Sequence, residues 1–317
     1  MSATTASPWH RGERELQQSV GVAERMEVFG RQVIRDFMPE QHRTFYLQLP
    51  FLVIAAVDAS GDPWATLVEA RAGLAQSADA RHLQINALPG RGDPAGDALM
   101  PGDGIGVLGI ELQTRRRNRV NGRVVARDDR QLTLQGEHAF GNCPQYIQAR
   151  AFRFSGDPAE PFVGRTEVLV KLDAEASAMI GAADTFFVAS YVDPEGDAGR
   201  RQVDASHRGG KAGFVRIDGD VLTIPDFAGN LHFNTLGNLQ VNPRAGLLFI
   251  DFANGDLLQL TGRTELVLAS DEVSSFQGAE RLWRLHVDKA VRRRGVLKLR
   301  WSPGEVSPNS LLTGSWD

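Results

Sequence analysis

The chain contains one sequence pattern twice, in the same order. Residues 51–62, FLVIAAVDASGD, return as residues 186–197, FFVASYVDPEGD, with matches at Phe, both Val, Asp, Gly and Asp. Shorter matches follow, joining residues 83–85 to 222–224, 108–110 to 248–250 and 122–123 to 262–263. The offset rises from 135 to 139 to 140, and chance similarity would not keep that order. A solenoid would have a much shorter period, so the pattern predicts two copies of one domain.

Length and composition agree with two soluble domains. The chain has 317 residues, 42% of them hydrophobic and 23% charged, which is ordinary for a globular protein. The net charge of -4 argues against a whole-chain role in coating nucleic acid. No apolar run approaches the ~20 residues of a membrane span, and the N-terminus lacks a signal-peptide pattern. Cys143 is the single cysteine, so an intrachain disulfide is excluded. We therefore expect a cytoplasmic protein with no membrane partner.

The expected elements are mostly short strands. One apolar stripe predicts a helix, which Pro39 ends, and its members are Val22, Met26, Phe29, Val33 and Phe37. Strands are expected at residues 52–57, 64–70, 83–86, 105–112 and 120–126, and then, after a helix at 174–180, at 185–192, 202–205, 214–217, 221–224, 245–252 and 257–264. Residues 87–106 suit a loop with one short helix, and residues 144–150 suit a helical turn. This pattern predicts a mainly β fold with antiparallel β-barrels and peripheral helices.

The same pattern predicts where the domains divide. We expect an N-terminal helical extension at residues 1–44, a first barrel copy at 45–160 and a second at 161–317. The most suitable linker is the segment 155–161, SGDPAEP, because glycine and proline interrupt regular structure there.

A strand of the second copy is expected to run into a polar, glycine-rich loop. Residues 204–214, DASHRGGKAGF, offer a hydroxyl, an imidazole, two cations and three glycines. Glycines allow backbone N–H groups to approach a ligand, and Arg208 with Lys211 can neutralise a phosphate. The alternative is a polar hairpin turn, which composition alone favours.

A second polar segment follows at residues 224–243. Asn230 is expected to cap a helix whose free N–H groups form an anion site. Asparagines recur there at a spacing of four, at Asn230, Asn234, Asn238 and Asn242. At an offset of 140, the first copy has Gly90, Pro94, Ala98 and Gly102 instead. This asymmetry predicts one ligand site, in the second copy, and a degenerate site in the first.

The first copy contains four arginines within residues 115–119. These could bind nucleic acid, but no aromatic residues interleave with them as a stacking surface would require. On a strand, Arg115, Arg117 and Arg119 share one face, so we expect this strand to lend one or two arginines to the same anionic ligand. Cys143 is a candidate nucleophile, although a lone cysteine is more often an inert buried group. The seven histidines form no ligand-spaced pair, so no metal site is predicted.

These residues resemble a known family, the FMN-binding split-barrel proteins related to pyridoxamine 5'-phosphate oxidase. The matching segments are residues 204–214, 229–230, 236–249 (LGNLQVNPRAGLLF) and 258–263 (LQLTGR). Residues 140–146, FGNCPQY, resemble a tail motif that follows the barrel in single-domain relatives. Together these segments extend the resemblance over residues 45–265.

The resemblance implies a six-stranded antiparallel split barrel in each copy, a homodimer, and FMN between subunits or between the two copies. Ser206, Arg208 and Gly209 match the strand edge that contacts the flavin, Asn230 to Asn238 match the phosphate side, and Gln259 matches a position that reaches a neighbouring flavin. The complete expected set is Ser206, His207, Arg208, Gly209, Lys211, Asn230, Asn234, Thr235, Asn238, Gln259, Arg117 and Arg119.

The leading hypothesis is an FMN-dependent oxidoreductase that acts on a small-molecule substrate. A non-catalytic flavin-binding or carrier protein is the first alternative, and a nucleic-acid-binding protein that uses residues 115–119 is a less favoured one. The serine-arginine-lysine phosphate motif of the true oxidases is not recognisable, which argues against pyridoxamine phosphate oxidation itself. No residue pattern identifies the catalytic residues, the substrate or the electron donor.

Overall fold

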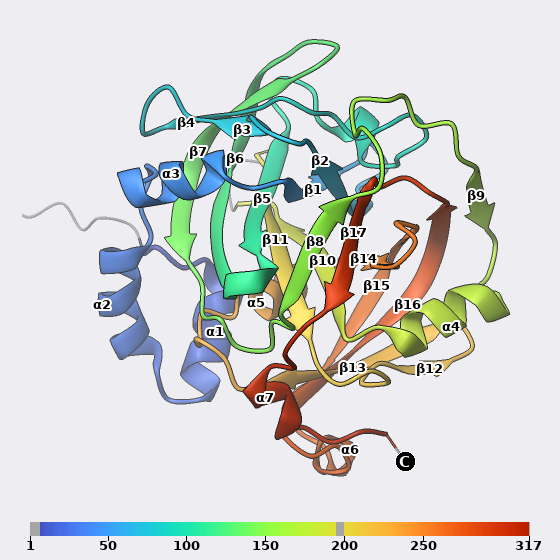
Figure 1. Cartoon of the computed structure of the whole chain (residues 1–317). Helices are drawn as coiled ribbons and strands as arrows, with labels where there is room; N and C mark the ends of the chain where they lie inside the picture. Colours follow the sequence, from blue (N-terminus) through green and yellow to red (C-terminus); the bar gives the residue numbers. More distant parts are fainter. Residues whose placement is uncertain (1–6, 195–199, 317) are drawn as a thin grey trace, which may run out of the picture.

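Two curled antiparallel sheets dominate the computed structural model, which describes residues 7–194 and 200–316 (Figure 1). The first sheet has the order β2-β1-β5-β6-β7-β4-β3. Its strands are β1 (Phe51–Val57), β2 (Pro63–Glu69), β3 (Ala75–Gln76), β4 (His82–Ile85), β5 (Gly104–Glu111), β6 (Arg116–Arg127) and β7 (Leu132–Gly141). The fold is therefore mainly β, as expected, and this sheet has seven strands where the resemblance implies six.

The second sheet repeats this strand order, as β11-β10-β14-β15-β16-β13-β12. Its strands are β10 (Thr185–Val192), β11 (Gln202–Gly209), β12 (Arg216–Asp218), β13 (Val221–Phe227), β14 (Arg244–Ile250), β15 (Leu257–Val267) and β16 (Ala279–Arg293). A further strand, β9 (Thr166–Leu169), pairs with β16. Each strand of the first sheet thus has an equivalent in the second, which lets positions be compared.

Matching bulges fix the equivalence of the two sheets. The pairing of β6 with β7 shifts at Gly122, and the pairing of β15 with β16 shifts at Gly262. A Cβ atom on Gly122 would collide with the backbone oxygen of Gln135, and one on Gly262 with that of His286. Both bulges therefore require glycine, and they place Gly122 opposite Gly262 in the comparison, at the expected offset of 140.

The first repeat match is out of register by one residue. Val53 pairs with Leu108 and packs in the core between the sheets. In the second sheet Phe187 pairs with Leu248 and packs in that same core, whereas Val188 points into the other face. Val53 therefore corresponds to Phe187, at an offset of 134, because a slip of one residue turns every side chain of a strand to the opposite face. Positions 196 and 197 of the match lie outside the described residues.

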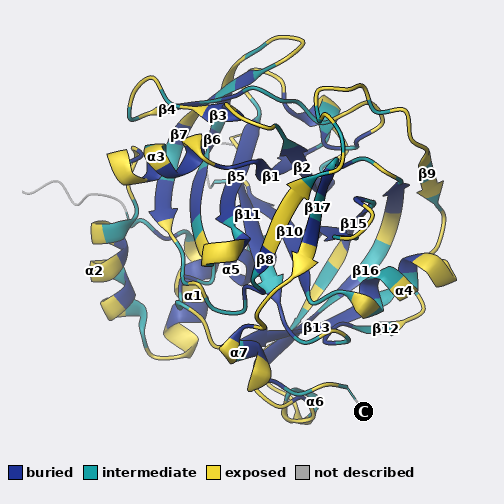
Figure 2. Ribbon diagram, viewed as in Figure 1, coloured by how far each residue is buried: buried dark blue, intermediate teal, exposed yellow. Residues whose placement is uncertain are grey.

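Three buried clusters hold the two sheets together. One lies within the curl of each sheet, and the third lies between them and draws residues from both (Figure 2). The segments that follow each sheet reinforce this join, because β8 (Arg150–Phe154) pairs with β17 (Leu299–Pro303). In Figure 1 these two strands run side by side across the front of the molecule. The two halves consequently share one of the three apolar clusters, and any surface between them is fixed by both.

Helices lie at the periphery of the sheets. They are α1 (Arg11–Ser19), α2 (Ala23–Val33), α3 (Glu40–Leu47), α4 (Ala174–Ala182), α5 (Asn234–Val241), α6 (Asp271–Ser274), α7 (Pro308–Leu311) and the short η1 (Gly96–Ala98) and η2 (Leu112–Thr114). The expected N-terminal helix ends at Val33, earlier than its apolar stripe, because Arg35 turns to pair with Ala139 of β7. Residues 144–150 do not form the expected helical turn, because only residues 145 and 146 form a turn and Arg150 already begins β8. Within the described chain, no helix is long and apolar enough to span a membrane.

Candidate functional site

A cleft opens between the two sheets, where β6 of the first sheet meets β11 of the second. Its walls also include β13, the start of α5 and the segment that follows β7. Nine of the twelve expected cofactor-binding residues line it: Arg117, Arg119, Ser206, His207, Arg208, Gly209, Asn230, Asn234 and Thr235. We call this surface the Arg117 cleft. Residues more than 80 positions apart in sequence meet here because β6 and β11 belong to different sheets.

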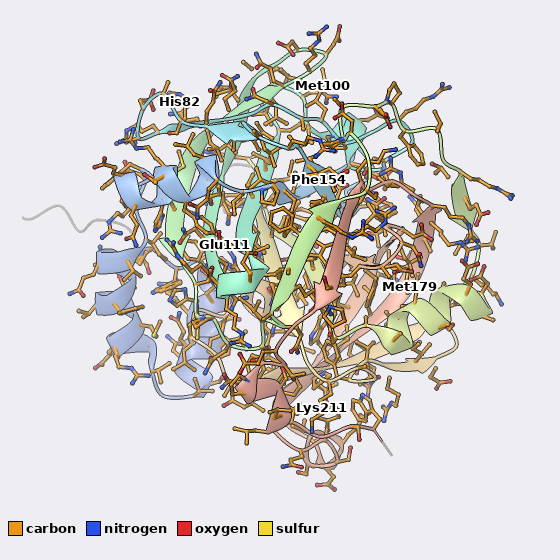
Figure 3. All side chains as sticks on the ribbon, viewed as in Figure 1. His82, Met100, Glu111, Phe154, Met179 and Lys211 are labelled. Atoms are coloured by element: carbon orange, nitrogen blue, oxygen red, sulfur yellow. The ribbon has the colours of Figure 1, made fainter. Side chains whose placement is uncertain are left out.

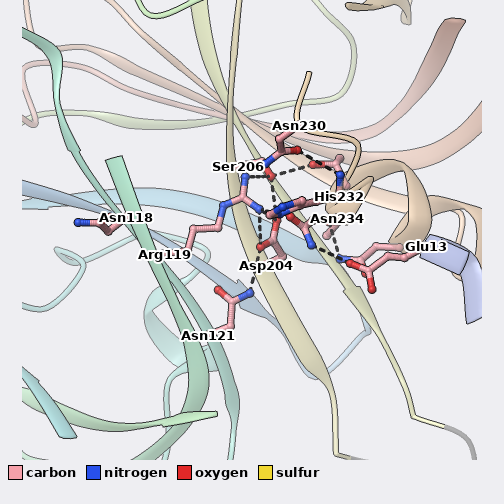
Figure 4. Close-up of polar contacts among 12 residues, drawn as sticks. Glu13, Asn118, Arg119, Asn121, Asp204, Ser206, Asn230, His232 and Asn234 are labelled. Carbon is pink, nitrogen blue, oxygen red and sulfur yellow. Dashed lines mark hydrogen bonds and ion pairs between the residues drawn. The ribbon is translucent and has the colours of Figure 1, made fainter. Parts of the chain in front are cut away.

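Arg119 is the centre of a buried polar network (Figure 4). Its Nη1 donates to Asp204 Oδ1 at 3.0 Å and to Asn234 Oδ1 at 3.0 Å, and its Nη2 donates to Ser206 Oγ at 2.8 Å. Thr235 Oγ1 also donates to Ser206 Oγ at 2.8 Å. Asp204 and Ser206 can both face Arg119 because alternate residues of a strand share a face. Burial lowers the pKa of Arg119, and the Asp204 carboxylate opposes that shift.

Arg117 contributes a second cation to the cleft, and it pairs with no carboxylate among the described residues. Its Nε donates to the backbone oxygen of Cys143 at 2.8 Å, and its Nη1 donates to His207 Nδ1 at 3.3 Å. Burial, together with Arg119 and Arg208, lowers the pKa of Arg117 to about 9. The group stays charged at neutral pH, so the cleft holds a positive charge that no neighbouring carboxylate balances.

His207 lines the same cleft, and one of its ring nitrogens has no hydrogen-bond partner among the described residues. Burial and the nearby arginines, Arg117 first, hold the pKa of His207 well below its ordinary value, so the ring is neutral. Because an arginine can only donate, Nδ1 accepts from Arg117 and the ring proton lies on Nε2. His207 is 5% exposed, and Nε2 has no hydrogen-bond partner within the part of the chain that the structure describes. It is thus a buried donor available to a ligand.

The outer part of the cleft combines ion pairs with aromatic rings. Arg208 and Arg281 both donate to Asp226, at 2.5 and 3.1 Å. Four aromatic residues complete the wall: Tyr146, Phe214, Phe227 and Phe233. The rings of Tyr146 and Phe227 lie 5.1 Å apart, and the Arg281 guanidinium lies 4.8 Å from the centre of the Phe233 ring. A planar aromatic ligand would therefore find both apolar contact and hydrogen-bonding groups here.

Backbone strain gathers around this cleft. Among the described residues, four that are not glycine have positive φ, and three of them line it: Tyr146, Leu231 and Phe233, with φ of 63°, 63° and 58°. Such left-handed conformations cost free energy in residues with a Cβ atom. They persist where surrounding structure enforces them, and they cluster at ligand sites. The geometry thus marks the same surface as the charges do.

Helix α5 begins later than the sequence indicates, and Asn230 does not cap it. The helix starts at Asn234, after Phe233, and Phe233 gives it no side-chain cap. Asn230 instead accepts a hydrogen bond from His232 N at 3.2 Å. Left-handed Leu231 and Phe233 explain the delay, because helical backbone cannot pass through that conformation. The first N–H groups of α5 therefore lie in the wall of the cleft, and Asn230 lies in the loop beside them.

The other three expected residues point elsewhere. Lys211 donates to the backbone oxygen of Thr313 at 2.5 Å, close to α7 (Figure 3). Asn238 lies on the face of α5 that packs against β10 and the N-terminal segment, where it donates to Ser190 and contacts His10. Gln259 donates to Ala65 and Asp93, both in the first half of the chain. Each is held by a long-range contact that the local sequence does not reveal.

The arginines of β6 and the residue before it do not form one exposed basic stripe. Arg115, with a left-handed φ of 57°, donates to the backbone of Ile147 and to Glu305. Arg116 lies over the ring of Phe45, 5.1 Å from its centre. Arg117 and Arg119 turn into the cleft between the sheets. The surface that a nucleic acid would need is thus divided between separate contacts.

Several residues of the site were not singled out by sequence reasoning. Asn142, Tyr146 and Asp226 lie in segments that were considered, but no charge pattern distinguished them there. Arg281 comes from β16, a strand for which no expectation was made. Glu13, which accepts a hydrogen bond from Asn234, comes from a helix 221 positions away. Only the fold brings Glu13 and Arg281 to this surface.

The equivalent position in the other half is closed. Strand order and register match Arg119 to Gln259, Ser206 to Thr66 and Asn142 to Arg293. Here Asp93 accepts from Arg293 Nη1 at 2.6 Å, from Gln259 at 3.1 Å and from Thr66 at 2.5 Å. The side chains of Arg293 and Asp93 are 1% and 0% exposed. We call this set the Arg293 region.

Comparisons with known proteins give only distant likenesses. No family model matches the chain, and no curated protein matches it. HupZ from Group A Streptococcus is 14% identical and covers 38% of this chain and 91% of its own, with a TM-score of 0.29. A putative pyridoxamine 5'-phosphate oxidase from Lactobacillus delbrueckii is 19% identical, with 33% and 95% covered and a TM-score of 0.27. HutZ, the heme storage protein from Vibrio cholerae, is 16% identical, with 39% and 96% covered and a TM-score of 0.27.

Proposed function

We propose that this chain is a tandem pair of split-barrel domains and that the Arg117 cleft binds one FMN molecule. The observation that carries the proposal is the unbalanced charge of Arg117 beside the unpaired Nε2–H of His207. Both walls of the cleft come from one chain. The proposed FMN therefore sits between the two sheets of one chain, and a second chain is not needed to complete the site.

The residues of the cleft fit the phosphate end of FMN. Arg117 supplies a cation whose hydrogen-bonding groups are not saturated by a carboxylate, and charge-assisted bonds to phosphate are the strong ones. The first N–H groups of α5 add donors and the positive end of a helix dipole. Arg208 is already held by Asp226, so we assign it a smaller share of the charge than Arg117.

They also fit the flavin ring. The aromatic wall described above provides apolar contact, and His207 provides a buried N–H for a ring carbonyl or nitrogen. Bound FMN would supply redox chemistry, and the protein groups around it would position the ring and set its electrostatic environment. Iron ligation by His207 is disfavoured while Nδ1 accepts from Arg117, because Nε2 then carries the ring proton and has no lone pair for a metal.

Titration of the purified protein with FMN, followed by flavin fluorescence, tests the proposal. Riboflavin, which lacks the phosphate, is the matched ligand. We expect FMN to bind more tightly than riboflavin, with one FMN per chain. Equal affinity for the two ligands would show that the cleft does not bind the phosphate. A protein that takes up neither ligand would show that the cleft is not a flavin site.

The proposal of an oxidoreductase needs a separate measurement. Reduction of the bound flavin by a nicotinamide cofactor in air, with repeated turnover, supports an enzyme. Stoichiometric binding without reduction supports the alternative of a flavin carrier.

A further inference from the structure

The N-terminal helix α1 packs directly on α5, the helix that borders the cleft. The two helices cross at Gly12 and Gly237. A Cβ atom on Gly12 would collide with the backbone oxygen of Gly237, and one on Gly237 would collide with the backbone and side chain of Glu13. Such an approach is open only to glycine, so α1 can dock in one close arrangement. Glu13 follows Gly12 and is thereby held at the start of α5.

Glu13 is part of a chain of hydrogen bonds that ends in the cleft (Figure 4). Its Oε1 accepts from Asn234 Nδ2 at 2.7 Å, and its Oε2 accepts from the backbone N–H of His10 at 3.0 Å. Asn234 in turn accepts from Arg119 at 3.0 Å. The chain therefore joins α1 to α5, and α5 to β6.

The order of donors and acceptors in this chain is fixed. Arg119 can only donate, so Asn234 must turn its oxygen to Arg119 and its NH₂ group to Glu13. Glu13 must then present an oxygen as acceptor. A residue without an acceptor at position 13 would leave the NH₂ group of Asn234 buried and unpaired, and this amide could then rotate away from Arg119.

We infer that Glu13 is a positioning residue of the Arg117 cleft, which orients Asn234 and through it Arg119, so that docking of α1 and binding in the cleft favour each other. The identity of the ligand rests on the proposed function. The orientation of Asn234 and Arg119 does not, and it can be measured without any ligand.

The protonation state of Glu13 determines how the docking of α1 depends on pH. Burial raises the pKa of Glu13 from 4.5 to about 8, with Asp204 adding to the shift while Asn234, His10 N–H and Arg119 oppose it. His10 on α1 and His138 on β7 also face this cluster, and burial lowers both of their pKa values. The docked state thus holds a neutral Glu13, and docking weakens as pH rises from 4.5 through about 8. Above pH 6.5 both histidines are neutral whether α1 is docked or not, so this range reports on Glu13.

The test uses Glu13→Ala and Glu13→Gln in the full chain, with Glu15→Gln as the control. Glu15 lies on the same helix, but it is 46% exposed and pairs only with nearby Arg11 among the contacts that the structure describes. The first readout is ligand-free: side-chain ¹⁵N–¹H resonances of Asn234 and Arg119, and hydrogen exchange of α1 and α5. We expect both resonances to move in Glu13→Ala and to stay in place in Glu15→Gln. Unmoved resonances in Glu13→Ala would overturn the inference whatever the protein binds.

The second readout is FMN affinity against pH between 7 and 8, below the pKa of about 9 at which Arg117 loses its charge. The wild type should lose α1 docking by about tenfold per pH unit up to pH 8, as release of one proton requires. Its FMN affinity should fall over the same interval, by up to about tenfold between pH 7 and 8, because linkage to one proton cannot exceed tenfold per pH unit. Glu13→Gln is neutral and keeps one acceptor, so it should bind without this fall.

The outcomes separate the two proposals. A wild type that binds no FMN ends the flavin assignment, while the resonances still decide the role of Glu13. If Glu13→Ala loses protection of α1 yet binds FMN as the wild type does, α1 only stabilises the fold and the inference fails. If Glu13→Gln keeps the wild-type pH dependence, another group titrates and the coupling through Glu13 fails.

Discussion

The Arg117 cleft and the Arg293 region occupy equivalent places between the two sheets, but they treat polar groups in opposite ways. The register matches Arg117 to Leu257, His207 to Leu67 and Arg208 to Val68. Three polar side chains of the cleft thus have apolar counterparts. Conversely, the uncharged Asn142 of the cleft corresponds to the charged Arg293, which forms a buried ion pair with Asp93.

This difference shows how one scaffold can keep or close a site. A buried charge needs a partner of opposite charge, and in the Arg293 region the Asp93 carboxylate is the partner of the Arg293 guanidinium. The Arg117 cleft retains a cation and an N–H group with free capacity, which is costly unless a ligand or water satisfies them. The closed region favours stability and the open cleft favours binding.

The largest expected effect is on the closed region. Arg293→Met should destabilise the protein by about 3–5 kcal/mol, because it leaves Asp93 charged, buried and without its cation. Urea unfolding measures the change. Arg294→Met is the matched control, since Arg294 is 40% exposed and pairs with Glu175, and its loss should stay within about 1 kcal/mol.

Adding Asp93→Asn to Arg293→Met should recover part of the lost stability, because the unpaired charge is then removed. Equal losses from Arg293→Met and Arg294→Met would show that the buried pair does not hold the region closed.

The second effect is acid sensitivity of the region where the N-terminal segment packs beside the open cleft. Burial lowers the pKa of both His10 and His232 from 6.5 to about 4, and it is the largest cause in each case. A lowered pKa in the folded state means that stability is lost as pH falls from 6.5 through about 4. The loss should reach up to about 3 kcal/mol for each histidine. Unfolding free energies measured between pH 7 and 4.5 give the slope, to which Glu13 contributes in the opposite sense because its pKa is raised.

His232→Phe provides the control for this slope. His232 lies among the rings of Trp9, Phe29 and Phe140, so phenylalanine suits the site and cannot titrate. The variant should lose less stability in acid than the wild type. An unchanged slope would show that His232 does not contribute to the loss of stability in acid.

The third effect is on ligand binding. Arg117→Ala should weaken FMN binding by about 1.5–3 kcal/mol, the usual worth of a charge-assisted bond, and Arg208→Ala should weaken it less, because Arg208 is already held by Asp226. Arg71→Ala should leave it unchanged, because Arg71 donates to the backbone of Gly156 and lies over Phe154, outside the cleft. Isothermal titration of the three variants with FMN makes the comparison. Losses of equal size in all three would mean that binding is not confined to the Arg117 cleft.

The sequence predicts most strands of the two sheets but not β7 or β16, and it predicts less well which face of a strand is turned inward. Gly122 and Gly262 match because a bulge forces the same residue at both places. Phe51 and Phe186 are the same residue type, but they do not occupy equivalent positions in the two sheets. The false match arises because apolar residues occupy both faces of strands that are buried on both sides. In such strands sequence similarity cannot detect a slip of one residue, and only pairing with Leu108 and Leu248 settles it.

The candidate site was predicted as far as local chemistry reaches. His207 and Arg208 lie on one strand, and their neighbourhood is visible in the sequence. The late start of α5 was not predictable, because tertiary contacts enforce the left-handed Leu231 and Phe233 against their preference. The sequence does not distinguish Gln259 from a ligand-binding residue. Its hydrogen-bond acceptor, Asp93, comes from a loop 166 positions away.

The smallest expected effect concerns the aromatic ring that covers each buried arginine. The Arg293 guanidinium lies 5.0 Å from the centre of the Phe162 ring, and that of Arg119 lies 5.6 Å from the Phe140 ring. Phe162 is partly exposed, whereas Phe140 is buried beside His232. Phe162→Leu keeps most of the apolar cover and removes the cation–π contact, so it should cost about 0.5–1 kcal/mol of stability.

The same change should leave FMN affinity unaltered, because Phe162 borders only the closed region. Phe140→Leu is the paired variant, and it should lower both stability and FMN affinity, since Phe140 supports the cation that holds Asn234. Urea unfolding and FMN titration of the two variants test this together. A fall in FMN affinity in Phe162→Leu would mean that the two regions communicate through the shared core, and the view of one open and one closed site as independent would have to be given up.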